Sequence, residues 1–224
     1  MEELSFGPNH GQRYGFILYR LRSNFSAKEI HVHGHFNDRT MFLRDHVAFT
    51  ILPPGVPAVN LKPKTDSNQS TVIYDFFVEN EGRQNHNVEM DNERKGFESS
   101  GNITLDGHLV TDYEIYSLEF NRTFMAKINS LPRQPIPETV PVWQGPELYI
   151  TTVNFVEVAD VWLSLPGWKK GQIFINDFNL GRYWNEKGPR TKFFVPKELL
   201  KIGKNHISLF ETVYPGKSIR FDVD

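Results

Sequence analysis

Hydrophobic and polar residues alternate in short runs along almost the whole chain, and the runs are rich in aromatic and β-branched residues. Gly, Pro, Asn or Asp bounds each run, which is typical of β-strands ended by turns. Only the run PKELLKIG at 196–203 has a helical pattern, with Pro at its start and Gly at its end. The pattern predicts strands at 14–20, 70–80, 113–120, 147–155, 172–176, 191–195 and 205–213.

Many short strands separated by turns, without alternating helices, indicate an all-β fold of two antiparallel β-sandwich or jelly-roll lobes with little helix. Residues 131–146 contain five prolines, so we expect an extended linker there. This places a first β-sandwich lobe at 1–130 and a second, jelly-roll lobe at 147–224.

The amino-acid composition limits the kinds of partner that we expect for this chain. The chain has 224 residues, 39% of them hydrophobic, which is enough to bury a core in each lobe. With 25 basic and 27 acidic residues and no long run of either sign, we expect no nucleic-acid partner. No apolar stretch approaches the roughly 20 residues that span a bilayer, so we expect no membrane span.

The cellular compartment stays open. The absence of cysteine excludes disulfides and thiolate zinc sites. Asn24, Asn68, Asn102 and Asn121 begin glycosylation sequons, which point to secretory-pathway ancestry. The acidic and polar N-terminus, however, is unlike a secretory signal. We expect a cytoplasmic or nuclear protein if Met1 is the native start, and a lysosomal or extracellular one if the chain is a fragment of a longer protein.

The segment EIHVHGHF at 29–36 holds the only candidate metal ligands. Alternate residues of a strand share a face, so His31, His33 and His35 are weak candidates for a zinc site with an open fourth position. Gly34 interrupts the run with a bend or bulge, and no carboxylate is placed to orient the imidazoles. We therefore favour a solvated strand face, and expect neither a metal nor a cofactor.

Motifs for catalysis are not found. The chain contains neither the G-x-S-x-G motif of serine hydrolases nor a phosphate-binding loop. Its acidic residues, such as Glu79, Glu81, Asp91, Glu93 and Asp106, fall in apparent turns rather than in paired-carboxylate motifs. The residues themselves therefore predict no catalytic group.

The segment GWKKGQIFINDFNLGRYW at 167–184 supports two interpretations. As a hairpin, its Asn and Asp residues form the turn between two strands, and its tryptophans cap a sandwich edge. As a sugar site, an aromatic face packs on a pyranose while amide and guanidinium groups bind hydroxyls. Periodicity does not choose between the two. The candidate glycan or interface residues are Trp168, Asn179, Arg182, Tyr183 and Trp184.

Residues 163–211 resemble the C-terminal β region of glycoside hydrolase family 35 β-galactosidases, in which the pattern runs PGW-x-KG, INGxNLGRYW and GPQ-x-TLYVP. Earlier blocks resemble the same family in the same order and cover nearly the whole chain. These blocks are YGFILYR (14–20), NDR (37–39), VENEGRQNH (78–86), KGFESSGNITLDGHLVTDYEIYSLEF (95–120) and GPELY (145–149).

The resemblance implies two β lobes and no galactosidase reaction in this chain. In this family the galactosidase reaction belongs to an N-terminal (β/α)₈ barrel with two catalytic glutamates, and this chain has no counterpart to that barrel. No catalytic residue therefore carries over. The resemblance implies two β lobes, the second galactose-binding-like, and makes GRYW a framework hairpin. Asp177 departs from the family, which usually has Gly there, so the turn must accept Asp with a positive φ.

Two functions remain as expectations. The first is a non-catalytic, β-galactosidase-like accessory protein that binds another protein, itself or a galactose-type glycan, with the former barrel-facing surface as the interface. The alternative is a C-terminal fragment or processed subunit of a complete family 35 β-galactosidase.

Overall fold

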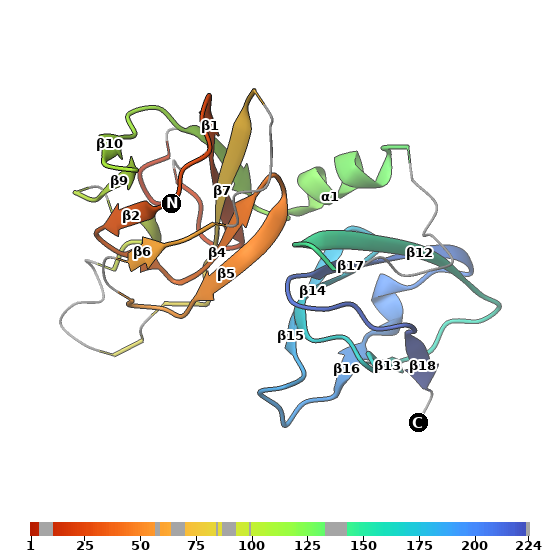
Figure 1. Ribbon diagram of the computed structural model, residues 1–224. Coiled ribbons are helices and arrows are strands. Elements are labelled where there is room, and N and C mark those ends of the chain that lie inside the picture. The colour runs from red at the N-terminus through yellow and green to blue at the C-terminus, as the bar shows by residue number, and fades with distance from the viewer. Residues whose placement is uncertain are drawn as a thin grey trace. The chain divides into compact units, whose positions relative to one another are not determined.

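The computed structural model describes residues 1–4, 11–56, 59–63, 70–83, 85–86, 93–98, 100–132 and 143–222. The chain forms two compact units, Met1–Glu119 and Phe120–Asp224, which run from red to green and from green to blue in Figure 1. Both units consist mainly of antiparallel strands, which confirms the all-β fold class.

The first unit contains a five-stranded sheet of order β11-β1-β7-β4-β5 and a four-stranded sheet of order β10-β9-β2-β6, with β3 paired to β8. The strands are β1 (Phe16–Ser23), β2 (Ile30–His33), β3 (Phe36–Asn37), β4 (Arg39–Arg44), β5 (Val47–Leu52), β6 (Val59–Leu61), β7 (Val72–Glu79), β8 (Gly96–Phe97), β9 (Asn102–Leu105), β10 (His108–Leu109) and β11 (Glu114–Leu118).

The two sheets of the first unit pack face to face. Alternate residues of β1, Ile17 and Tyr19, enter the core together with Tyr74 of β7. Ile30 and Ile103 enter the same core from the four-stranded sheet. Residues two apart on a strand share a face, so this alternation explains why one side of each sheet is apolar.

The second unit contains a four-stranded sheet of order β12-β17-β14-β15 and a three-stranded sheet of order β16-β13-β18. Its elements are α1 (Arg122–Asn129), β12 (Glu147–Phe155), β13 (Val161–Ser164), β14 (Lys170–Ile175), β15 (Phe178–Trp184), β16 (Lys192–Val195), a 3₁₀ turn (Lys197–Leu199), β17 (Gly203–Glu211) and β18 (Arg220–Asp222).

These two sheets enclose the core of the second unit. Ile173 and Ile207 from the larger sheet meet Leu163 and Val195 from the smaller one, and all four are buried. The opposite face of the larger sheet is also covered. There the ring of Phe120 lies 5.4 Å from that of Phe174 and 4.7 Å from that of Phe210, measured between ring centres.

All seven predicted strands are present, with ends that differ by a few residues. The predicted helix at 196–203 is a single 3₁₀ turn, Lys197–Leu199. The sequence pattern does not indicate helix α1. Asn121 caps this helix, because its Oδ1 accepts a hydrogen bond of 2.9 Å from the backbone N–H of Phe124. In the sequence Asn121 stands out only as the start of a sequon, and the eight-residue helix is too short to show clear periodicity.

Helix α1 belongs to the second unit, so the boundary between the two units falls after Glu119, earlier in the chain than the predicted linker at 131–146. Residues 133–142 of that linker lie outside the described residues. The role of this stretch as an extended linker stays a prediction.

The predicted hairpin at 172–184 is formed by β14 and β15. Asn176 and Asp177 join the strands with φ values of 48° and 69°. Two consecutive left-handed residues make a primed turn, whose twist matches that of the flanking strands. The turn therefore accepts Asp177 with a positive φ in the place where the resemblance implies Gly. The pairing of β14 with β15 contains a register shift between Ile173 and Phe174: Phe174 pairs with Asn179, whereas Ile173 pairs with Gly181.

Candidate functional site

Two of the five candidate residues of the hairpin region are buried. Trp168 is 6% exposed, and its indole N–H donates a hydrogen bond of 2.9 Å to the backbone carbonyl of Ser218. Tyr183 is 1% exposed, and its hydroxyl donates to Oε2 of Glu211 at 3.0 Å. Buried Trp and Tyr side chains need such partners for their polar atoms. Both residues therefore contribute to the framework of the second unit.

The other three candidates lie on β15 and are partly exposed. The ammonium group of Lys170 lies 4.0 Å from the centre of the Trp184 ring, which is cation–π geometry. The side-chain oxygen of Asn179 accepts a hydrogen bond of 3.0 Å from the backbone N–H of Gly181. Arg182 pairs across the sheet with Gln172. The use of these side chains in ligand binding stays a prediction.

A buried carboxylate organises the region around Trp168 and Tyr183. Glu211, at the end of β17, is fully buried. One of its oxygens, Oε1, accepts backbone N–H groups of Thr212, Val213 and Tyr214 at 3.0, 2.7 and 3.2 Å. This oxygen also accepts the N–H of Lys170 at 3.1 Å, and the N–H of Lys169 donates to the other oxygen at 2.9 Å. Glu211 thus ties the start of β14 to the chain that follows β17.

Burial raises the pKa of the Glu211 carboxyl, because desolvation penalises its charged form. The backbone N–H groups and the Tyr183 hydroxyl oppose this effect, because they stabilise the charge. Burial also raises the pKa of the Tyr183 hydroxyl, and the neighbouring Glu211 charge acts in the same direction. Tyr183 therefore stays protonated and remains a donor to the carboxylate.

The segment held by Glu211 forms one wall of a groove in the second unit. The groove has a volume of about 700 Å³ and is bordered by Trp168, by residues 149–151 of β12, and by residues 214–219. On the floor, Ile207 and Leu209 come from β17. Trp168 is the one hairpin-region candidate among its described lining residues, and its ring packs edge-to-face against Tyr149 at 5.1 Å.

The groove combines aromatic and polar groups. Tyr214 is 51% exposed and Tyr149 is half-buried, so both rings are accessible from the groove. Thr151, Lys217 and Ser218 bring a hydroxyl, an ammonium group and a second hydroxyl to the same lining. A mostly apolar site with a few convergent polar groups is typical of small-ligand sites.

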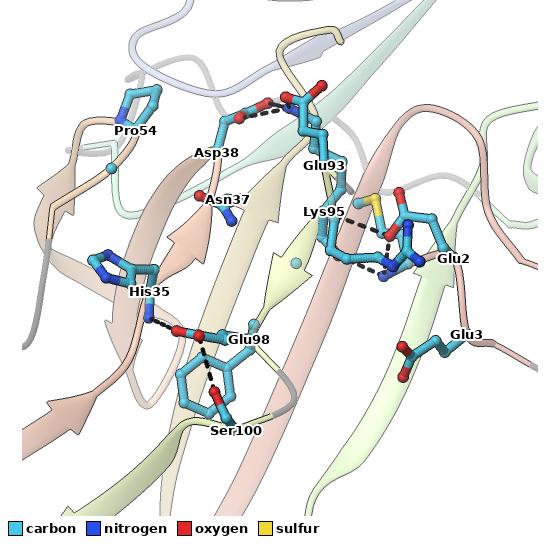
Figure 2. A pocket seen from close by; sticks show the side chains of 15 residues that line it. Glu2, Glu3, His35, Asn37, Asp38, Pro54, Glu93, Lys95, Glu98 and Ser100 are labelled. Carbon is cyan, nitrogen blue, oxygen red and sulfur yellow. Dashed lines mark hydrogen bonds and ion pairs between the residues drawn. The ribbon is translucent and has the colours of Figure 1, made fainter. Parts of the chain in front are cut away.

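The first unit contains a second hollow, of about 680 Å³, shown from close by in Figure 2. At its centre, Lys95 is buried, and its ammonium group lies 2.8 and 2.9 Å from the two carboxylate oxygens of Asp38. The same ammonium group lies 2.5 Å from Glu93, and the backbone N–H of Lys95 donates to Glu2 at 2.9 Å. The positive charge of Lys95 is therefore paired with the carboxylates of Asp38 and Glu93.

A further carboxylate on the wall of this hollow is also engaged. Figure 2 shows that Glu98 faces the main chain of His35 and the hydroxyl of Ser100. Its two oxygens accept hydrogen bonds of 3.1 Å from the His35 N–H and 2.9 Å from Ser100. The hollow is therefore a charged structural site, and the groove of the second unit is the better candidate for ligand binding.

The histidine motif is split by its glycine. His31 and His33 lie on β2 with nearly parallel rings whose centres are 6.2 Å apart. Gly34 has a φ of 112°, and the strand ends before it, so His35 is not on the strand face that carries the other two. In the described part of the chain, no group of three His, Asp or Glu side chains is arranged to hold a metal ion.

Sequence reasoning missed most of the groove and all of the Lys95 cluster. The Tyr-Pro-Gly-Lys run at 214–217 has turn-forming residues next to an aromatic residue, which is a weak signal for a binding loop. Asp38 and Lys95 each belong to a short block that resembles the family, but nothing in their spacing indicates that they meet. No α-helix among the described residues is long and apolar enough to cross a membrane.

Comparison with known proteins follows the same division into two parts. The family model "Beta-galactosidase, first all-beta domain" matches residues 7–119. The model "Beta-galactosidase, galactose-binding domain" matches residues 146–205. Only non-catalytic β-galactosidase domains are therefore matched.

Curated relatives align along most of the chain. Beta-galactosidase-1-like protein 3 of Homo sapiens is 31% identical over 221 residues, covering 98% of this chain and 32% of that protein. Beta-galactosidase-1-like protein 2 of Homo sapiens is 32% identical, with coverages of 99% and 33%. Beta-galactosidase of Homo sapiens is 30% identical, with coverages of 84% and 29%. The chain thus spans about a third of the length of these relatives.

Among solved structures, a lectin from Pleurotus ostreatus in complex with GalNAc matches 89% of this chain and 68% of its own. The sequence identity is 13% and the TM-score is 0.29, a likeness too slight to carry an argument.

Proposed function

Since the chain belongs to the β-galactosidase family through two of that family's all-β domains, we propose that it acts by binding, and that the groove of the second unit holds a galactose-type glycan. The catalytic part of the family's architecture has no counterpart in this chain. Its function therefore rests on the surfaces of the two β units.

The observation that carries the glycan proposal is the composition of the groove. Tyr149 and Tyr214 offer ring surface against which the apolar C–H face of a pyranose can pack. Thr151, Lys217 and Ser218 offer hydrogen-bond partners for sugar hydroxyls beside those rings. The galactose-binding domain model matches residues 146–205, which include the lining residues Tyr149, Ile150, Thr151 and Trp168. The other lining residues, between 207 and 219, follow that range.

The test is chemical-shift mapping of the chain with galactose and lactose. We expect shifts of the signals of Thr151 and of residues 214–218. A Tyr214→Ala variant is expected to weaken binding, whereas Tyr116→Ala, at an exposed tyrosine of the first unit, leaves it unchanged. Silence at millimolar sugar, or shifts confined to residues away from the groove, would overturn the proposal.

A second candidate function follows from the coverage of the relatives. Because the chain spans about a third of their length, it is also proposed as the C-terminal region or a processed subunit of a longer β-galactosidase. In that case the surface that faces a catalytic barrel binds that protein partner. A continuous reading frame upstream that encodes a barrel would establish this function.

An assay of galactoside hydrolysis distinguishes both candidate functions from that of a complete enzyme. We expect no hydrolysis of a chromogenic galactoside by the pure chain. We expect activity to depend on an added catalytic region if the chain is a subunit. Hydrolysis by the chain alone, persisting through repeated purification, would contradict both candidates.

A further inference from the structure

Strand β12, teal in Figure 1, forms one edge of the four-stranded sheet of the second unit. It is nine residues long and pairs with β17 in an unbroken register from Glu147 to Phe155. Thr151, Thr152 and Asn154 are exposed, unlike the residues of the central strand β14. Within the described residues, no strand pairs with the outer edge of β12.

Three other edge strands, β15, β5 and β11, carry features that hinder pairing. On β15, the register shifts beside Gly181, which has a φ of 130°. On β5, the pairing with β4 shifts between Phe42 and Leu43. Strand β11 has five residues and bears Glu114, which is bonded to Arg22. Bulges, charges and short length are the usual means of protecting sheet edges.

Strand β12 has none of these protections. Its sequence, ELYITTVNF, contains no Lys, Arg or Pro, and its pairing with β17 shows no bulge. The one charge is that of Glu147, whose carboxylate accepts a hydrogen bond from the Tyr149 hydroxyl. A long, regular and nearly uncharged edge presents a row of backbone N–H and C=O groups to another strand.

We propose that β12 pairs antiparallel with β12 of a second copy of this chain, about a two-fold axis at Thr151. The sheets of the two copies then join into one sheet of eight strands, four from each copy. A two-fold interface uses the same surface on both copies, so a self-complementary strand is the simplest occupant.

The side chains of β12 fit this register. With Thr151 facing Thr151, Tyr149 lies opposite Val153 and Ile150 lies opposite Thr152. Aromatic–β-branched and Thr–Thr neighbours are favourable cross-strand pairs. Glu147 lies opposite Phe155, so the two glutamates of the dimer do not face each other. These matches favour a second copy over an unrelated extended segment as the occupant.

The test uses the absence of cysteine in the natural chain. Wild-type protein is expected to sediment as a dimer at micromolar concentration, and Thr151→Lys to weaken dimerisation at least tenfold, because it places two ammonium groups opposite each other. Thr151→Cys is expected to cross-link into a covalent dimer under mild oxidation. Thr191→Lys and Thr191→Cys, made at an exposed threonine of the same unit, are the matched controls and are expected to behave like the wild type.

Circular dichroism and thermal melting of each variant separate loss of pairing from loss of folding. A wild-type chain that stays monomeric at high micromolar concentration would overturn the proposal. So would a dimer that survives Thr151→Lys and does not cross-link through Thr151→Cys, because its interface would lie elsewhere. Thr151 also lines the groove, so the glycan titration uses the wild type and Tyr214→Ala, whose substitution lies outside β12. Either proposal can then fail without the other.

Discussion

The hydroxyl of Tyr183 and the carboxylate of Glu211 form a buried hydrogen bond of 3.0 Å between β15 and β17, two strands that are separated in the sheet by β14. Gly171 of β14 makes this contact possible, because it lies between them and has no side chain. An added Cβ there would lie 1.8 Å from the backbone oxygen of Phe210 and 2.7 Å from the Tyr183 hydroxyl.

Gly171→Ala is therefore expected to lower the free energy of unfolding by about 3 kcal/mol or more, since backbone atoms must shift to accept the methyl group. The control is Gly203→Ala, where a Cβ would meet no atom within 4 Å. Gly203 has a φ of 91°, so its substitution costs only backbone strain, about 1 kcal/mol. Denaturant unfolding measures both, and equal costs would contradict the close approach.

Glu211→Gln is expected to destabilise the second unit by about 3 kcal/mol, because an amide nitrogen accepts no hydrogen bond, whereas both carboxyl oxygens can accept buried N–H groups in either protonation state. Glu198→Gln, at an exposed glutamate of the same unit, is the control and is expected to change the free energy of unfolding by less than about 0.5 kcal/mol. A cost similar to that of the control would show that the Glu211 network is not needed for stability.

The cost of Glu211→Gln should also depend on pH. Because burial raises the pKa of Glu211 above its usual value of 4.5, the folded state holds this proton more tightly than the unfolded state. The stability that this group contributes is then fully present below the unfolded pKa and is lost as pH rises through the folded pKa. The difference in unfolding free energy between wild type and Glu211→Gln is expected to shrink as pH rises from about 4. A difference that grows with pH would show that hydrogen bonding outweighs burial.

Substitutions of Asp177 test the turn of the hairpin. Its φ of 69° is strained for a residue with a side chain, but its carboxylate accepts a hydrogen bond from the side chain of Asn129 in α1. Asp177→Ala loses the bond and keeps the strain, so it is expected to cost about 1–2 kcal/mol. Asp177→Gly loses the bond but relieves the strain, and is expected to cost about 1 kcal/mol less than the alanine variant. Equal melting temperatures for the two variants would contradict this account.

In the first unit, Lys95→Met is expected to cost about 3 kcal/mol, because it leaves the carboxylates of Asp38 and Glu93 without their shared cation. The control, Lys62→Met, removes an ammonium group that is 74% exposed and 3.5 Å from Glu29. Its expected effect is below about 0.5 kcal/mol. Calorimetry of both variants measures their melting temperatures. Equal melting temperatures for Lys95→Met and Lys62→Met would contradict the prediction.

Much of the strand order along the chain was predictable, because strands here are runs of aromatic and β-branched residues between turn formers. Strand β12 was predicted with its exact bounds. Helix α1 was missed because its stability comes from a cap at Asn121 and from the burial of Met125, and neither produces a long periodic pattern.

The candidate site was less predictable, because it depends on contacts between distant segments. Glu211 accepts hydrogen bonds from Lys169 and Lys170, about forty residues earlier, and so brings residues 214–218 beside Trp168. The sequence marks Trp168 as unusual, but it does not show that Tyr149 and Tyr214 border the same groove. Local patterns report on strands and turns, whereas a groove is made by tertiary packing.

Glu211 holds the wall of the groove through main-chain N–H groups, including those of Val213 and Tyr214, and not through their side chains. The conformation of this loop is therefore nearly independent of which amino acids occupy those two positions. Substitution at position 214 is therefore expected to change the lining of the groove while the loop keeps its course. A single buried anchor of this kind separates the residue that fixes the loop from the residues that line the groove.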